Sequence, residues 1–286
     1  MIALKTGNAI VMLVFPIMVS AYLINRYKTN WKMWGIGGLI FIISQVGHIP
    51  FNSIASKLLN NTTMILLDQN QKIIFNALFL GLSAGIWEET SRYVGYRVWL
   101  KKPKAWIDGL TLGLGHGSFE SILIGFLAIY VLIQMVGLKG VDLTNIVPLD
   151  RLEFTMNSIQ QYWNANWFDS LLGSIERIFT LPLQILLSLL IVNIFKRRKI
   201  GFYFLAVIIH TVVDASAVLL ISFTNVYLTE TFIGVISFFS IIAIILLKDK
   251  GEKIELNNND LPLLETGNMK VELDDSILDL EDTKYI

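Results

Sequence analysis

The sequence predicts an all-α fold, a polytopic bundle of about seven transmembrane helices. Three observations predict it. Of the 286 residues, 54% are hydrophobic and only 16% are charged. The apolar residues form unbroken runs, and crossing a bilayer needs about 20 such residues. Basic residues cluster between alternate runs, which is typical of cytoplasmic loops.

Seven apolar runs are candidate membrane spans. The first run has only Lys5 as an N-terminal charge and lacks a small-residue cleavage site, so we interpret it as a retained helix rather than a signal peptide. The predicted spans cover residues 8–25, 33–56, 73–99, 107–137, 167–195, 202–222 and 229–247.

The orientation follows from the basic residues, which are concentrated after the first, third, fifth and seventh spans. The other connections contain few bases or mix both signs of charge. The positive-inside rule then predicts an N-terminus outside and a C-terminus in the cytoplasm. The basic connections contain Arg26, Lys28 and Lys32; Arg97, Lys101, Lys102 and Lys104; Lys196, Arg197, Arg198 and Lys199; and Lys248, Lys250 and Lys253.

Two segments lie outside the spans. Residues 138–166 mix apolar and polar side chains, which suits either an interfacial helix at the outer surface or a partly ordered loop. Residues 251–286 hold ten acidic and three basic residues and too little apolar surface to fold alone. We therefore predict a transmembrane body over residues 1–249 and a disordered, acidic cytoplasmic tail over residues 250–286.

Ionisable side chains inside the apolar runs are the candidate functional residues. The chain has no cysteine, so thiolate nucleophiles and thiolate metal ligands are excluded, and hydrolysis would need carboxylates, histidines or hydroxyls. Glu88, Glu89 and Arg92 lie in the run that begins at Ile73. A charge within a membrane helix is costly, so this acidic pair indicates a functional site.

Two histidines are expected at the same depth as Glu88. Glu88 precedes Arg97 by nine residues, His116 follows Lys104 by twelve, and His210 follows Lys199 by eleven. At ~1.5 Å per helical residue, all three lie ~13–18 Å from the cytoplasmic charges. We therefore expect three different helices to bring these side chains into one cavity.

Spacing within each helix predicts partners for these groups. Glu88 and Arg92 are four residues apart, and so are His116 and Glu120, and His210 and Asp214. At this separation Arg92 can keep Glu88 ionised, and a carboxylate can orient its imidazole. Small residues before Glu88 and around His116 further predict that spans three and four approach closely.

A third histidine lies deeper, on span two. His48 either lines the substrate path, with Glu120 in a supporting position, or is held by a hydrogen bond to Glu120 or to a backbone carbonyl.

Three motifs together resemble the YhfC-type intramembrane proteases, distant relatives of the CAAX prenyl endopeptidase and bacteriocin-processing (CPBP) superfamily and of the PrsW proteases. The resemblance covers spans two to six. The motifs are Glu88-Glu89-Thr90-Ser91-Arg92-Tyr93, Gly115-His116-Gly117 with Glu120, and His210 with Asp214.

The resemblance implies a role for each residue. Glu88 matches the glutamate that activates water, with Glu89 and Arg92 as its companions. His116 matches the histidine that shares that water, and His210 with Asp214 matches the pair that stabilises the oxyanion.

The CAAX-protease pattern differs from this chain in three ways. It has one more residue between the glutamate pair and the arginine, a phenylalanine where this chain has Leu112, and an asparagine where it has Asp214. An ionised aspartate cannot donate to an oxyanion, so we expect Asp214 to orient His210 instead.

The implied function is intramembrane endopeptidase activity in a multi-pass protein of the bacterial cell membrane. The expected partners are the lipid bilayer and a membrane-embedded or lipid-anchored protein substrate, without nucleic acid. We expect the peptide bond to enter a cavity open toward the cytoplasmic half. A metal-free glutamate mechanism is favoured, while Glu88, His116 and His210 are the ligands if zinc is present.

Two other classes of function stay open. The same carboxylates and histidines could form the ion relay of a proton-coupled or cation-coupled transporter, although the sequence has no internal repeat. A non-catalytic scaffold or immunity protein could also be built on a protease-like fold.

Overall fold

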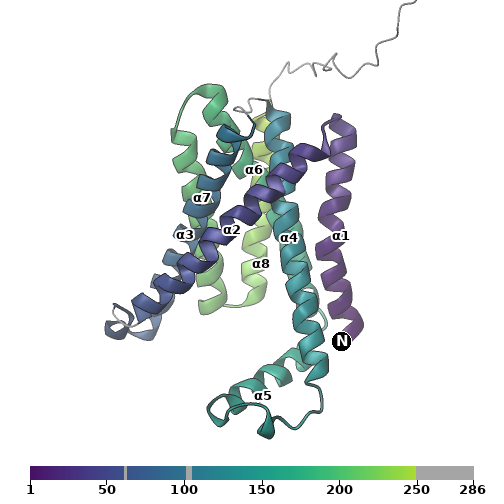
Figure 1. The fold of residues 1–286 in the computed structure, drawn as a ribbon, viewed down its shortest axis with the longest axis vertical. Coiled ribbons are helices and arrows are strands. Elements are labelled where there is room, and N and C mark those ends of the chain that lie inside the picture. Colours follow the sequence, from purple (N-terminus) through teal and green to yellow (C-terminus); the bar gives the residue numbers. More distant parts are fainter. Residues whose placement is uncertain (61–62, 101–104, 249–286) are drawn as a thin grey trace, which may run out of the picture. The chain divides into compact units, whose positions relative to one another are not determined.

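The computed structural model describes residues 1–60, 63–100 and 105–248 of the chain (Figure 1). In this part the secondary structure is entirely helical, with eight α-helices and three short 3-10 helices. The α-helices are α1 (Ile2–Tyr27), α2 (Trp31–Asn60), α3 (Gln69–Val98), α4 (Trp106–Gly137), α5 (Leu149–Asn164), α6 (Leu172–Arg197), α7 (Gly201–Phe223) and α8 (Val226–Leu246). The 3-10 helices are η1 (Thr63–Leu66), η2 (Leu143–Asn145) and η3 (Asp169–Leu171).

The seven longest helices coincide with the seven predicted spans. Six of the described helices are long and apolar enough to cross a membrane. The seventh, α3, has 30 residues and contains Glu88, Glu89 and Arg92, which lower its hydropathy. The predicted all-α, multi-pass membrane fold is confirmed.

The segment between the fourth and fifth predicted spans contains a helix. Of the two alternatives for residues 138–166, the structure has helix α5 over Leu149–Asn164, and none of its residues is buried. Lys5 of α1 lies over the ring of Tyr162 at its end, 3.9 Å from the centroid. The predicted acidic tail, residues 250–286, lies outside the described residues.

Helix α4 contacts α1, α2 and α6 extensively, and glycines allow two of these approaches. A Cβ on Gly37 of α2 would collide with the backbone carbonyl of Leu112 in α4, and one on Gly115 of α4 would collide with the backbone of Trp34 in α2. Gly113 faces Ile185 and Ser188 of α6 in the same way. Helices without side chains at such positions can bring their backbones close together.

Helix α3 packs most extensively against α7 rather than α4. Gly81 and Gly85 of α3 lie against Val207, Thr211 and Ala215 of α7. The predicted backbone approach of spans three and four is therefore wrong, because the small residues of α3 and those of α4 face different neighbours. Spans three and four do touch near the polar cluster, where the side chains of Glu88 and His116 meet.

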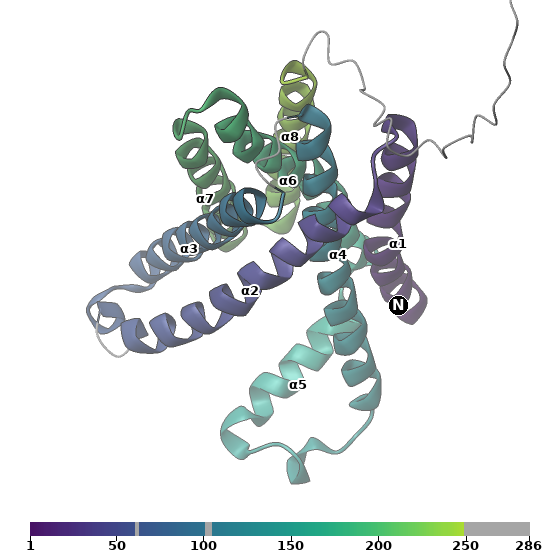
Figure 2. The same cartoon turned by 45° about the horizontal axis from the view of Figure 1, so that its top comes forward.

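Packing is much tighter in the half of the bundle that carries the basic connections. Every residue of α4 from Gly109 to Ser118 is buried, and so is every residue of α6 from Leu183 to Ile194. Beyond Ser118, most residues of α4 are partly or fully exposed. The α2–α3 hairpin diverges from α4 toward this opposite end (Figures 1 and 2). The ionisable cluster lies at the boundary between the closed and the open half.

Candidate active site

Glu88 connects three helices at this boundary. Its Oε2 lies 3.1 Å from Nε2 of His116 on α4, and its Oε1 accepts a hydrogen bond of 3.0 Å from Nε2 of Gln45 on α2. The residue is 7% exposed, and His116 is fully buried. Charged groups so deep in a membrane helix need such partners.

His210 completes the cluster from α7. Its Nδ1 lies 2.8 Å from Oε1 of Glu89, and its Nε2 lies 3.9 Å from Oε2 of Glu88. The predicted meeting of Glu88, His116 and His210 on three helices is confirmed. Asp214 also approaches His210, with Oδ2 3.5 Å from Nε2, but its side chain is 40% exposed.

Arg92 is fully buried and holds the second glutamate. Its guanidinium donates to Glu89 and to the amide oxygen of Gln184 on α6, whereas the oxygen of Glu88 is 3.7 Å away. The predicted approach of Arg92 to Glu88, four residues apart, is observed at this distance, but Glu89 is the carboxylate to which Arg92 donates directly. Glu89 lies one residue closer along the helix and accepts directly.

Glu120 belongs to a neighbouring group of polar side chains. Its Oε2 accepts a hydrogen bond of 2.6 Å from Nε2 of Gln184, and its Oε1 lies 2.6 Å from Nη1 of Arg177. Arg177 also pairs with Glu176. The predicted orientation of His116 by Glu120 is thus not observed, because Glu120 is engaged by α6 instead.

His48 is bonded within the α2–α3 hairpin rather than to Glu120 or a backbone carbonyl. Its Nδ1 lies 3.4 Å from Oε1 of Gln45, and its Nε2 lies 3.2 Å from Ser83 Oγ and 2.8 Å from Asn52 Nδ2. Since Gln45 also donates to Glu88, His48 is linked to the cluster through one amide. Neither hydrogen bond of the second interpretation is observed, and the first interpretation, in which His48 lines the substrate path, stays a prediction.

Gln45 and Gln184 are the contacts that sequence reasoning missed. Each is an amide in an otherwise apolar helix, which was the available signal, because a buried amide needs hydrogen-bond partners. Neither was paired with the carboxylates, since the relative rotation of α2 and α6 cannot be read from spacing along one helix.

Three buried atoms of the cluster have no hydrogen-bond partner among the described residues. They are Nδ1 of His116, Oε2 of Glu89 and Nε of Arg92. A buried unsatisfied polar group costs about 1–3 kcal/mol. A bound water or a substrate amide would satisfy such groups.

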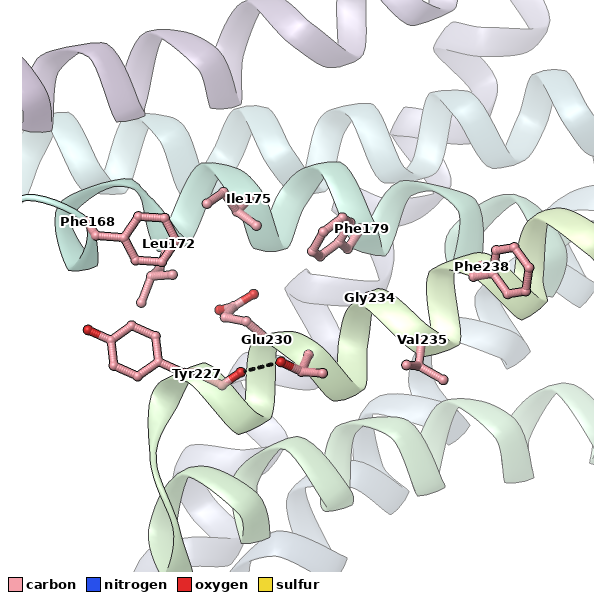
Figure 3. A pocket seen from close by; sticks show the side chains of 10 residues that line it. Phe168, Leu172, Ile175, Phe179, Tyr227, Glu230, Gly234, Val235 and Phe238 are labelled. Carbon is pink, nitrogen blue, oxygen red and sulfur yellow. Dashed lines mark hydrogen bonds between the residues drawn. The ribbon is translucent and has the colours of Figure 1, made fainter.

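A groove between α6 and α8 lies away from this cluster. Its volume is about 650 Å³, and aromatic side chains line it together with Glu230 (Figure 3). A second groove of about 240 Å³ lies between α2 and α3 and includes Trp87 and Ser91. Neither groove is lined by Glu88, His116 or His210.

Comparison with known proteins identifies the family. The model of a family described as YhfC intramembrane metalloprotease matches residues 11–246. The chain belongs to the YhfC family. An uncharacterized membrane protein YhfC from Bacillus subtilis (strain 168) is 28% identical over 206 residues, which cover 71% of this chain and 79% of that protein. No solved structure matches. The YhfC match spans every residue of the cluster, from Gln45 to Asp214.

The description of the YhfC family implies a bound metal ion, for which Glu88, His116 and His210 are the candidate ligands. Glutamate and histidine are suitable zinc ligands in type. Glu88 and His116 are instead joined by a direct hydrogen bond, and the Arg92 guanidinium lies 3.7 Å from the same Glu88 oxygen. Among the described residues, no group of three or more His, Cys, Asp or Glu side chains could hold a metal ion. As placed, these residues do not fit a metal.

Proposed function

We propose that this protein is an intramembrane endopeptidase that uses Glu88 and His116 to activate water. The supporting observation is the 3.1 Å contact between a buried carboxylate and a buried imidazole from different helices. The substrate class is a membrane-embedded or lipid-anchored polypeptide, because the reacting groups lie within the membrane span.

In the proposed reaction, water enters between Glu88 and His116, and Glu88 accepts one of its protons. The remaining hydroxide forms a bond to the carbonyl carbon of the peptide. Glu88 then returns the proton to the leaving nitrogen as the C–N bond breaks. One carboxylate therefore serves as base and then as acid.

In this mechanism, His210 stabilises the negative charge that develops on the carbonyl oxygen. Its Nδ1 is held by Glu89, so its Nε2 faces the Glu88 side of the cluster. A donor that is already oriented stabilises the transition state without a reorganisation cost during the reaction. Arg92 and Gln184 contribute by holding Glu89 in place.

The direct test compares purified wild-type protein with the Glu88→Gln variant in proteoliposomes. Membrane peptides from cells that express each form are compared by mass spectrometry to find products that depend on Glu88. Glu153→Gln is the matched control, because Glu153 is exposed on α5. Loss of the products in Glu88→Gln alone supports the proposal, and equal products from all three forms reject it.

The same preparations distinguish the proposed protease from a zinc-dependent protease, a transporter and a non-catalytic scaffold. Stoichiometric zinc in elemental analysis, lost together with cleavage on chelation, would replace the metal-free mechanism. Proton-coupled flux without cleavage would favour a transporter. Neither cleavage nor flux would favour a scaffold or immunity protein.

A further inference from the structure

The cluster is closed on one side and partly open on the other. On the side of the basic connections, Ser44 and Thr111 are fully buried, as are Tyr96 and Ile191. These residues belong to four helices, so packed side chains separate Glu88 from this end of the bundle. The groove of about 240 Å³ between α2 and α3 lies on the same side, but Glu88 is not among the residues that line it.

Polar side chains on the opposite side keep part of their surface exposed. Asp214, one turn beyond His210, has a 40% exposed side chain, and Glu120, one turn beyond His116, is 18% exposed. His48 and Asn52 on α2 are half-buried. Carboxylates and imidazoles facing lipid would be strongly unfavourable, so exposed polar groups at this depth indicate contact with water.

These polar groups are also connected to the reacting carboxylate. The amide nitrogen of Gln45 donates a hydrogen bond to Glu88, and its amide oxygen lies 3.4 Å from Nδ1 of His48. Nδ2 of Asn52 lies 2.8 Å from the other ring nitrogen of His48. On α7, His210 lies between Glu88 and Asp214. The open side therefore leads directly to the candidate catalytic groups.

From this arrangement, we propose that water and substrate reach Glu88 from the non-cytoplasmic half of the membrane, through an opening bordered by His48, Asn52, Glu120 and Asp214. The clustered basic residues place the closed side toward the cytoplasm. The cytoplasmic opening expected from the sequence does not agree with this exposure pattern. The substrate class, which rests on the proposed function, is a membrane-tethered polypeptide whose scissile bond is delivered from the non-cytoplasmic side.

Because the chain has no cysteine, single cysteines can map the opening without background labelling. Asn52→Cys and Asp214→Cys report on the opening, and Ser44→Cys and Thr111→Cys report on the closed side. Asn157→Cys on α5 and Lys199→Cys between α6 and α7 are exposed and serve as controls for the two membrane surfaces. Each variant is treated with a membrane-impermeant maleimide in right-side-out and in inverted membrane vesicles.

We expect Asn52→Cys and Asp214→Cys to label from the same side as Asn157→Cys, and Lys199→Cys to label only from the other side. Ser44→Cys and Thr111→Cys should label only after denaturation. Labelling of both opening positions from the Lys199 side would overturn the proposal. So would labelling of neither position in vesicles when both label fully after denaturation.

Labelling does not depend on hydrolysis, so failure of the protease function and failure of the access route are separable. The two opening positions lie on different helices, and a misfolded variant is recognised by its elution in size-exclusion chromatography. If one of them misfolds, the other decides the outcome.

Discussion

Nδ1 of His210 lies 2.8 Å from Oε1 of Glu89, an acid on a different helix, whereas Asp214 on its own helix is partly exposed and lies 3.5 Å from the other ring nitrogen. The ring is therefore oriented mainly by Glu89. An aspartate at position 214 is therefore compatible with an imidazole that is already oriented from another helix.

The first prediction concerns these two acids. Asp214→Asn should keep cleavage within about fivefold of the wild-type rate, because a partly exposed ion pair contributes only ~0–1 kcal/mol. Glu89→Gln should lower kcat by at least about tenfold, since it removes the acceptor that orients the imidazole. Steady-state cleavage assays of both variants would measure this, and the opposite ranking would assign the orienting role to Asp214.

Glu88→Gln should lower kcat by about 10²–10⁴-fold, the usual contribution of a general base. The amide cannot accept the proton but can still bond His116, so the fold should be retained. Circular dichroism and size-exclusion chromatography of the same sample check the fold. Unchanged cleavage in a well-folded variant would exclude Glu88 as the base.

Gln45→Leu should lower kcat by about 10–100-fold, because a hydrogen bond to a charged group contributes about 1.5–3 kcal/mol. The side chain donates to Glu88 and lies close to His48, so its loss frees one oxygen of the carboxylate. Gln134→Leu is a matched control, since Gln134 bonds only the exposed Tyr130 among the contacts described. Equal rates in both variants would show that Gln45 does not position Glu88.

Arg92→Met should destabilise the bundle by about 3–5 kcal/mol, since the buried carboxylate of Glu89 loses its guanidinium partner and keeps only His210. The double variant Arg92→Met with Glu89→Gln should recover part of that loss, because the charge is then removed as well. Unfolding in mixed detergent, analysed as a double-mutant cycle, measures the coupling. Additive losses would mean that the two side chains do not interact.

Gly115→Ala should lower the melting temperature, because the new methyl group collides with the Trp34 backbone where α2 meets α4. Overpacking of this kind costs about 1–3 kcal/mol. Gly7→Ala is the control, since a Cβ there meets no atom within 4 Å. Equal melting temperatures for the two variants would argue against the close α2–α4 approach.

Much of the fold could be predicted because local features of the sequence, namely runs of apolar residues and the charges between them, determine the membrane spans. Depth was also predictable, since helical rise is constant, and it correctly brought Glu88, His116 and His210 together. Rotation of each helix about its axis was not predictable. For that reason Glu120 was assigned to His116 although it bonds Gln184 and Arg177, and the glycines of α3 were assigned to α4 although they face α7.

Helix α3 is the least apolar of the membrane-length helices, yet it is synthesised before α4 and α7, which later contact its acids. Two of its polar contacts form without those helices, because Arg92 pairs with Glu89 and Gln45 of the preceding helix bonds Glu88. The α2–α3 hairpin can therefore enter the bilayer with its charges partly neutralised. We therefore expect the contacts that arrange the site also to lower the cost of inserting α3 during biosynthesis.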